Sequence, residues 1–268
     1  MLPGLLGIAV FYLIPFGDVV RRSFLQMSGE AFCGMDNYRT VFSNAAFRLA
    51  AKNTARFVLV CLPLLLVLSL LLALLASRFS VRLLTVFKSA FLLPMAIPAA
   101  SVVLLWRLLF DVNGFVNGAL HGMGISSVDW MNTGAAFAVL VFSYIWKNLG
   151  YTMILWLAGL ASVPKEVYEA AAIDGAKSAA RFFKITLPLI RPMIFTIVVI
   201  SLLNSFKVFR EAYLVSGNYP QESIYLLQHL FNNWFLDLSV DKMAAGSVVL
   251  ALVIGLFVGI LARCWEER

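Results

Sequence analysis

The sequence has 268 residues, of which 62% are hydrophobic and 13% are charged, and its formal net charge is +7 at pH 7. A soluble globular domain carries about 25% charged residues, so this composition excludes an ordinary soluble domain and predicts an all-α integral membrane protein. The basic excess does not indicate nucleic-acid binding, because most Lys and Arg residues occur singly in loops at the ends of apolar segments. Three cysteines are too few for a disulfide framework.

A helix that crosses a bilayer needs about 20 consecutive apolar residues. We predict six spans within one transmembrane domain over residues 1–268, at residues 2–17, 57–76, 89–106, 135–160, 193–215 and 243–264. The first stretch could instead be a cleaved signal peptide, although it lacks a basic lead-in and a small-x-small cleavage site. Short segments of strict alternation, which a transmembrane β-barrel would show, are absent from the sequence.

A polar, alanine-rich loop lies between the fourth and fifth predicted spans, at residues 162–188. Pro164 suits a first helical turn, and Gly175 can end the following helix in a left-handed cap. Ser178 can cap a second short helix, whose end is marked by Pro188. We therefore predict two short helices in water at one membrane face. A helix that lies flat on the lipid surface is the alternative.

This loop carries a spaced motif, Glu-Ala-Ala followed by Gly and then by Ile-x-Leu-Pro. The motif residues are Glu169, Ala170, Ala171, Asp174, Gly175, Ile185, Leu187 and Pro188. They closely resemble the coupling loop of bacterial ABC-importer permeases. The resemblance implies the fold of the type I-like importer permease, with six transmembrane helices and a cytoplasmic coupling-helix loop. It also implies that these residues contact the ATPase subunits.

Further motifs along nearly the whole chain resemble the carbohydrate-uptake subclass of these permeases, which includes the maltose, glycerol-phosphate and multiple-sugar types. They are Phe32-x-Gly34-x-x-Asn37-Tyr38, Asn53-Thr54, Leu93-Pro94, Pro98, Gly114-x-x-Asn117-x-x-Leu120, Trp130, Trp146-x-x-x-Gly150, Ala158-Gly159-Leu160 and Phe206-x-x-Phe209. One departure is the turn Gly217-Asn218-Tyr219-Pro220, where the subclass usually has Gly-Gly-Pro; this change could alter the contact with a binding protein. The N-terminus is shorter than usual for the subclass, which leaves open whether a cytoplasmic lead is missing.

The resemblance implies a permease subunit of an ATP-driven importer, which forms with a second permease the path for a carbohydrate delivered by an extracellular binding protein. The implied partners are that second permease, in a heterodimer, two ATP-binding cassette subunits, the binding protein and the lipid bilayer of the bacterial inner membrane. The sequence has no Gly-Lys pair and hence no phosphate-binding P-loop. We therefore expect no cofactor in this chain, with ATP and Mg²⁺ bound by the partner subunits.

Other functions remain open at this point. A permease for glycerol-phosphate or a polyol fits the same motifs. An ion-coupled secondary transporter would be expected to show interrupted half-helices in matching repeats, which are not evident. A membrane-bound transferase would need a catalytic cluster, yet the two histidines, His121 and His229, lie in no acidic or Cys-rich motif. We expect neither a catalytic nor a metal site.

The orientation in the membrane follows from the motif more than from the charges. Lys and Arg are only slightly more frequent on the side of the coupling loop if that loop is cytoplasmic, which is a weak preference. Residues 21–56 resemble the outer loop that follows the first span in sugar permeases. We predict that 21–56 lies outside and that 77–88, 161–192 and the C-terminus are cytoplasmic.

Polar residues in the fourth and fifth spans are candidates for the solute path. They are Tyr144, Asn148 and Tyr151 in the fourth span and Ser201, Asn204 and Ser205 in the fifth, and the helical spacing places each set on one face. Amides, hydroxyls and aromatic rings can bind a sugar, and the resemblance places the solute passage between these two spans. The same residues could instead be hydrogen-bonded contacts between helices.

Charged residues in these spans have two possible roles. Lys147 lies in the middle of a span, Lys207 and Glu211 are four residues apart and could pair, and Arg210 lies to one side. They could form structural ion pairs, or they could contact an anionic or phosphorylated solute. In the last span, small residues recur at every fourth position and would let another helix approach closely. These are Ser247, Ala251, Gly255 and Gly259.

Overall fold

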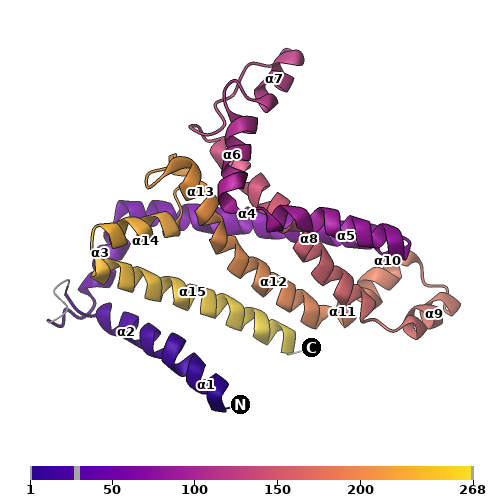
Figure 1. Cartoon of the computed structure of the whole chain (residues 1–268). Helices are drawn as coiled ribbons and strands as arrows, with labels where there is room; N and C mark the ends of the chain where they lie inside the picture. Colours follow the sequence, from indigo (N-terminus) through magenta and orange to yellow (C-terminus); the bar gives the residue numbers. More distant parts are fainter. Residues whose placement is uncertain (1, 27–30, 267–268) are drawn as a thin grey trace. The chain divides into compact units, whose positions relative to one another are not determined.

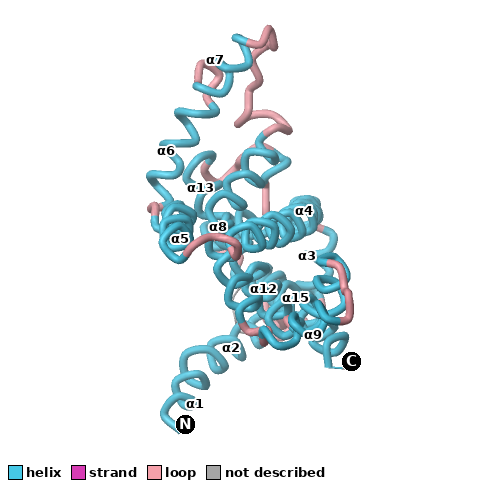
Figure 2. The backbone as a smooth tube through the Cα atoms, turned by 90° about the vertical axis from the view of Figure 1, so that its right-hand side faces the viewer, coloured by secondary structure: helices cyan, strands magenta, loops and turns pink. Residues whose placement is uncertain are grey.

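A computed structural model describes residues 2–26 and 31–266 of the chain. Within these residues the backbone is mostly helical and contains no β-strand, as the tube in Figure 2 shows. An isolated bridge joins Leu25 and Phe32. Six helical stretches of the described residues are long and apolar enough to cross a membrane. The structure thus confirms the expected all-α membrane fold and the expected number of spans.

These six stretches are Pro3–Arg22, Ala45–Ala76, Ala99–Gly122, Ala136–Ala161, Arg191–Ser216 and Val240–Arg263. The second, fourth and sixth each lie on one helix, namely α4 (Ala45–Ala76), α8 (Ala136–Ala161) and α15 (Val240–Glu266). The first is interrupted by a π-helical turn and consists of α1 (Leu2–Ile8), η1 (Ala9–Leu13) and α2 (Ile14–Arg22). The third consists of α6 (Ala99–Phe110) and α7 (Phe115–Gly122).

The third stretch differs from the span expected at residues 89–106. In the structure α5 (Val81–Ala96) ends before Pro98, and α6 begins directly after it. Ile97 is extended, with φ −73° and ψ 127°, because a residue that precedes proline is pushed out of the helical region. The expected span is therefore two helices joined at a bend. The expected loop at 77–88 is correspondingly reduced to residues 77–80 before α5 begins.

The chain divides into two compact units, and each is described by itself. The first comprises Met1–Ala55 and Ser216–Ile260, and the second comprises Arg56–Val215 and Leu261–Arg268. The expectation of a single domain over residues 1–268 stays a prediction.

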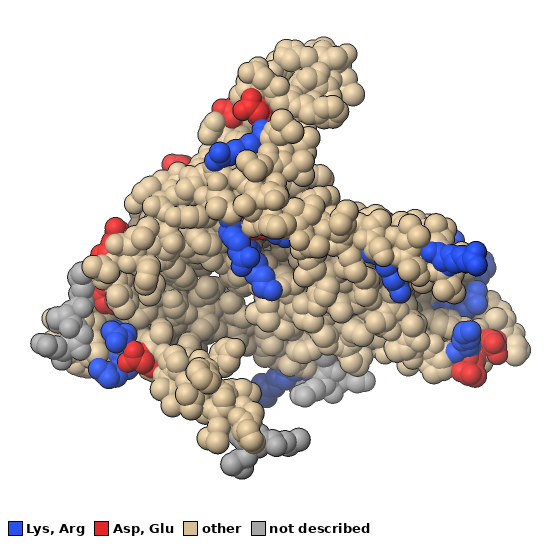
Figure 3. All heavy atoms as spheres, viewed as in Figure 1, with Lys and Arg blue, Asp and Glu red and all other residues tan. Residues whose placement is uncertain are grey.

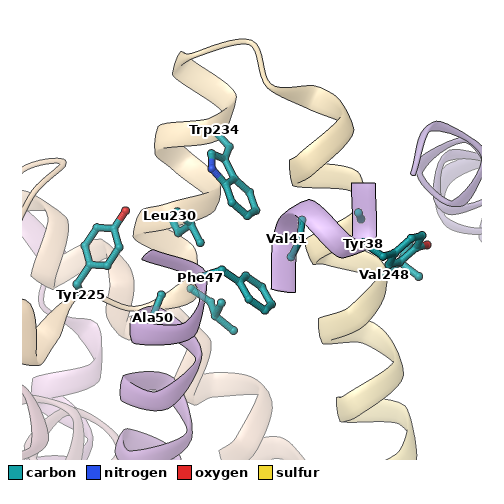
Figure 4. Close-up of a cluster of buried hydrophobic side chains, with 10 residues drawn as sticks. Tyr38, Val41, Phe47, Ala50, Tyr225, Leu230, Trp234 and Val248 are labelled. Carbon is teal, nitrogen blue, oxygen red and sulfur yellow. The ribbon is translucent and has the colours of Figure 1, made fainter. Parts of the chain in front are cut away.

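The first unit is built around an apolar cluster drawn from four helices. Figure 4 shows these side chains on α3 (Asp36–Ser43), the start of α4, α14 (Leu227–Leu236) and α15, with Tyr225 in the segment before α14. The rings of Phe47 and Trp234 stack with their centroids 6.3 Å apart, and Val41 is fully buried beside them. Helices from both ends of the sequence are thus joined in one core.

Hydrogen bonds from side chains to backbone groups explain two of the sequence motifs in this unit. The Asn53 amide donates to the carbonyl oxygens of Glu222 at 2.6 Å and Tyr225 at 3.1 Å. The Thr54 hydroxyl accepts from the backbone N–H of Leu227, at the start of α14, at 3.0 Å. Asn37 similarly donates to the carbonyl oxygens of Ser23 and Leu25. Because buried backbone groups need partners, these side chains fix the segments before α3 and α14.

In the second unit, α8 contacts both α5 and α12 (Arg191–Ser205), as can be followed in Figure 1. The two helices α5 and α8 approach each other closely at Gly150. A Cβ atom added there would lie far inside van der Waals contact with the backbone oxygen of Phe91 and 2.9 Å from its Cβ. Only glycine fits at this crossing, which gives the Trp146-x-x-x-Gly150 motif a structural reason.

Asn117 organises the segment that follows α6. It is buried, its amide donates to the carbonyl oxygens of Asp111, Val112 and Val128, and its Oδ1 accepts from the backbone N–H of Val128 and the indole N–H of Trp130. This one side chain closes the loop after α7. The motif residues Asn117 and Trp130 therefore stabilise this loop.

Candidate functional site

The predicted coupling loop contains two helical pieces, as expected. The first is α9 (Lys165–Ile173), and the second is a continuous run of α10 (Ser178–Arg181), the π-helical η2 (Phe182–Thr186) and α11 (Leu187–Leu189). Their starts differ by one residue from the expectation. Pro164 precedes α9 as its N-cap, with an extended ψ of 139°, and Lys177 rather than Ser178 is the N-cap of the second piece. Ser178 is already helical, so its side chain does not cap.

Gly175 ends α9 in the left-handed conformation that the sequence predicts, with φ +72°. The N–H of Gly175 donates to the carbonyl of Ala172 at 3.1 Å, and the N–H of Ala176 donates to the carbonyl of Ala171 at 2.9 Å. These two bonds make a Schellman motif, which satisfies the last carbonyls of the helix. The motif fixes the direction in which the chain leaves α9.

The inner face of α9 is attached to the rest of the second unit. Ala171 is buried, and Tyr168 packs against the apolar cluster that includes Trp156 and Ile190. The Tyr168 hydroxyl lies 2.9 Å from the Thr186 hydroxyl, so the two helical pieces are joined by a hydrogen bond. A displacement of α9 would therefore also move η2 and the start of α12.

The outer face of α9 is exposed and combines a carboxylate with small and apolar side chains. Glu169 and Ala170 are exposed, and Ile173 is 87% exposed. On η2, Phe183 is 65% exposed. At the right-hand end of Figure 3, where Figure 1 places α9 and α10, both acidic and basic atoms lie at the surface. Ile173 and Phe183 were not predicted as surface groups, although two large apolar residues within a polar loop are a signal for such a surface.

The remaining motif residues of the loop lie at its surface or edge. Asp174 and Pro188 are exposed, while Ile185 and Leu187 are half-buried. Pro188 lies near the start of α11, and the run ends one residue later at Leu189. The motif thus forms one continuous feature from Glu169 to Pro188, with alternating anchored and exposed positions.

A second feature is a polar cavity where the fifth stretch is interrupted. α12 ends at Ser205 and is followed by the 3₁₀ turn η3 (Phe206–Val208) and by α13 (Phe209–Ser216). Beside this turn lies a cavity of about 210 Å³. Its lining residues come from α5, α8 and the interrupted fifth stretch, and they are Met95, Ser143, Tyr144, Lys147, Asn148, Asn204, Lys207, Val208, Arg210 and Glu211.

The structure brings together half of the candidate solute-path residues at this cavity. Tyr144, Asn148 and Asn204 line it, whereas the half-buried Tyr151 is outside its lining. Ser201 and Ser205 are buried away from it. The carbonyl of Ser201 accepts a hydrogen bond from the Tyr144 hydroxyl at 2.7 Å, and the Ser205 hydroxyl donates to the carbonyl of Leu202 in its own helix. The hydrogen bond at Ser201 joins α8 to α12, and the hydrogen bond of Ser205 lies at the end of its own helix.

The charged side chains pair differently from the expectation. Glu211, which is buried, forms an ion pair with Lys147 on α8, and the Lys207 ammonium donates to the Asn204 amide oxygen at 2.7 Å. The pair that Lys207 and Glu211 could form along a regular helix is not formed, because the 3₁₀ turn between them has about three residues per turn. That geometry places Lys207 above Asn204, three residues earlier, and turns Glu211 toward α8.

Two curated relatives match almost the whole chain. The arabinooligosaccharides transport system permease protein AraP of Bacillus subtilis (strain 168) is 34% identical over 261 residues, which cover 94% of this chain and 82% of AraP. The sn-glycerol-3-phosphate transport system permease protein UgpA of Yersinia pestis is 32% identical over 266 residues, which cover 96% of this chain and 90% of UgpA.

Solved structures match the fold over the same length. A bacterial ABC transporter involved in the import of the acidic polysaccharide alginate has a chain that aligns with a TM-score of 0.84 at 24% identity, covering 99% of this chain and 93% of that one. The alginate transporter in complex with an alginate pentasaccharide-bound periplasmic protein aligns with a TM-score of 0.81 at 25% identity, covering 98% and 92%.

The family model of the binding-protein-dependent transport system inner membrane component matches residues 66–268, which include the coupling loop and every residue that lines the polar cavity. Together with relatives that are more than 30% identical over almost the whole chain, this match shows the family. The chain belongs to the inner membrane components of binding-protein-dependent transport systems.

Proposed function

We propose that this chain is the permease subunit of an ATP-driven importer, in which it forms with a second permease the path for a carbohydrate delivered by an extracellular binding protein. The observation that carries the proposal is α9, a short helix with an anchored inner face and an outer face that has no partner within the described chain. A helix presented in this way can enter a groove on another subunit.

In this proposal the outer face of α9 contacts an ATP-binding cassette subunit in the cytoplasm. Glu169 offers a carboxylate to a basic residue there, and Ile173 and Phe183 offer apolar surface. ATP and Mg²⁺ are held by those subunits, and this chain contributes no cofactor of its own. The loop at 161–192 then lies inside the cell and the segment at 21–56 outside. Conformational changes of the ATP-binding cassette subunits are transmitted to the spans through the Tyr168–Thr186 hydrogen bond.

The solute class is proposed from the cavity and from the relatives. The cavity offers amide groups from Asn148 and Asn204 next to the ring of Tyr144, which is suitable chemistry for sugar hydroxyls. The names of AraP and of the alginate transporter refer to carbohydrates. A glycerol-phosphate solute is the second candidate, because UgpA carries that name and the cavity is lined by three cationic side chains.

The test is uptake by the complete transporter in liposomes. This chain, its second permease and the ATPase subunits are reconstituted together, the binding protein is added outside, and labelled oligosaccharides, polyols and glycerol-3-phosphate are supplied one at a time. We expect uptake of a carbohydrate that depends on ATP and on the binding protein. Uptake driven by an ion gradient without ATP would refute the proposal, and ATP-dependent uptake of glycerol-3-phosphate alone would favour the second candidate.

A further inference from the structure

The cavity at the interrupted fifth stretch carries more positive charge than its carboxylate can balance. Its lining includes Lys147, Lys207 and Arg210, and Glu211 contributes the opposing charge. Lys147 and Glu211 pair with each other. Within residues 2–26 and 31–266, neither Lys207 nor Arg210 forms an ion pair. Two cations at the cavity therefore remain without a counter-ion from the described chain.

This excess is energetically unusual at its position. Lys207 and Arg210 both belong to Arg191–Ser216, one of the stretches apolar enough to cross a membrane. A Lys or Arg at the centre of a membrane-spanning helix costs about 2.5–3.5 kcal/mol on insertion scales, and such residues normally face a polar path. Here both side chains are exposed toward a cavity with room for several water molecules. The position is thus suited to a hydrated path that attracts anions.

The chemistry around the two cations also fits a sugar. An Arg guanidinium presents a planar fork that matches carboxylate and phosphate groups, and a Lys ammonium adds a mobile point charge. The Asn148 amide N–H donates to the carbonyl of Tyr144, and the Asn204 amide oxygen accepts from Lys207. The Oδ1 of Asn148 and the amide N–H groups of Asn204 make no hydrogen bond with the described chain, so they can serve sugar hydroxyls.

We infer that this cavity selects an anionic carbohydrate, one that carries a carboxylate or a phosphate group, and that Lys207 and Arg210 determine this specificity. The inference rests on the proposed function as a carbohydrate permease. A competing explanation is that acidic side chains of the second permease neutralise both cations in the assembled transporter. In that case the two residues would support assembly and would not discriminate between solutes.

The experiment compares charged and neutral solutes in the complete, reconstituted transporter. The probes are trigalacturonate with neutral galactotriose, and glycerol-3-phosphate with glycerol. Lys207→Gln and Arg210→Gln remove one charge each, while Lys207→Arg and Arg210→Lys retain it. Arg48→Gln is the matched control, because Arg48 is an exposed cation outside the cavity lining. The same binding protein serves every variant, so a changed ratio of charged to neutral uptake reports on this chain.

We expect the wild type to import an anionic probe, and each Gln variant to lose it by about 10-fold or more, the usual effect of deleting a charged hydrogen-bond partner. The Gln variants should import the neutral probes and assemble as the wild type does. The Arg48→Gln control should import all probes normally, and the charge-retaining variants should keep most of the anionic uptake. The uronate and phosphate arms identify the anionic group. Equal effects on charged and neutral probes, or lost assembly with an unchanged ratio, would overturn the inference while the proposed function stands. Failure to import any carbohydrate would overturn both.

Discussion

The turn at Gly175 offers the sharpest test of how the coupling loop works. The substitution Gly175→Val places a β-branched residue at φ +72°. Apart from the local backbone, no atom lies within 4 Å of the added Cβ, so the effect comes from that backbone alone. The left-handed conformation costs an ordinary L-residue about 1–2 kcal/mol. If the turn rearranges instead, two Schellman hydrogen bonds worth about 0.5–1.5 kcal/mol each are lost.

A penalty of about 1–2 kcal/mol reduces the population of the native turn by roughly 5- to 30-fold. Membrane insertion should be unaffected, because the spans insert through their own hydrophobicity. The matched control is Gly175→Asn, since Asn is similar in size to Val and adopts left-handed conformations much more readily than Val does. We expect both variants at normal membrane levels, but only Gly175→Val to lose solute-stimulated ATP hydrolysis and uptake in liposomes. Equal coupling in the two variants would refute a role for this cap.

Three further predictions concern packing, the solute path and pH. Gly150→Ala should destabilise the protein by about 1–3 kcal/mol or more through overpacking against Phe91, which would be seen as a lower apparent melting temperature. Gly118→Ala is the control, because a Cβ there enters open space and should leave the melting temperature unchanged. Asn148→Ala should change uptake affinity, whereas Ser205→Ala, whose hydroxyl bonds within its own helix, should not; the reverse order would contradict the cavity as the path. Burial lowers the pKa of His229 to about 4, so stability present above pH 6.5 should fall by about 3 kcal/mol toward pH 4, and His229→Gln should flatten that profile in a thermal melt.

The sequence was sufficient for features that depend on local chemistry. Gly175 was predicted as a left-handed cap, because few other residues end a helix in that way, and the six apolar stretches were recognisable from length and composition. The bend at Pro98 also had a local signal, which the prediction of a continuous span at 89–106 did not use. Here the apolar character of the flanking residues concealed the break.

The features that escaped prediction depend on tertiary contacts. The 3₁₀ turn at Phe206–Val208 contains neither Pro nor Gly, so nothing local marks the interruption of the fifth stretch. Lys147 and Glu211 are 64 residues apart, and their pairing follows from the contact of α8 with the fifth stretch. Asn148 lines the cavity, whereas the Ser205 hydroxyl bonds within its own helix. This difference likewise depends on how the turn rotates the chain.

The proposed role of α9 as a cytoplasmic contact for the ATPase can be measured directly with one engineered cysteine. Ala170→Cys, with Cys33, Cys61 and Cys264 replaced, puts a thiol on the exposed face of the helix. Met123→Cys is the matched control: Met123 is exposed, and it follows the third span, so it should lie on the membrane face opposite to the loop that follows the fourth span. In intact cells a membrane-impermeant maleimide should label position 123 and not position 170, and a thiol cross-linker should join position 170 to an ATPase subunit. Labelling of position 170 from outside, without such a cross-link, would contradict the account.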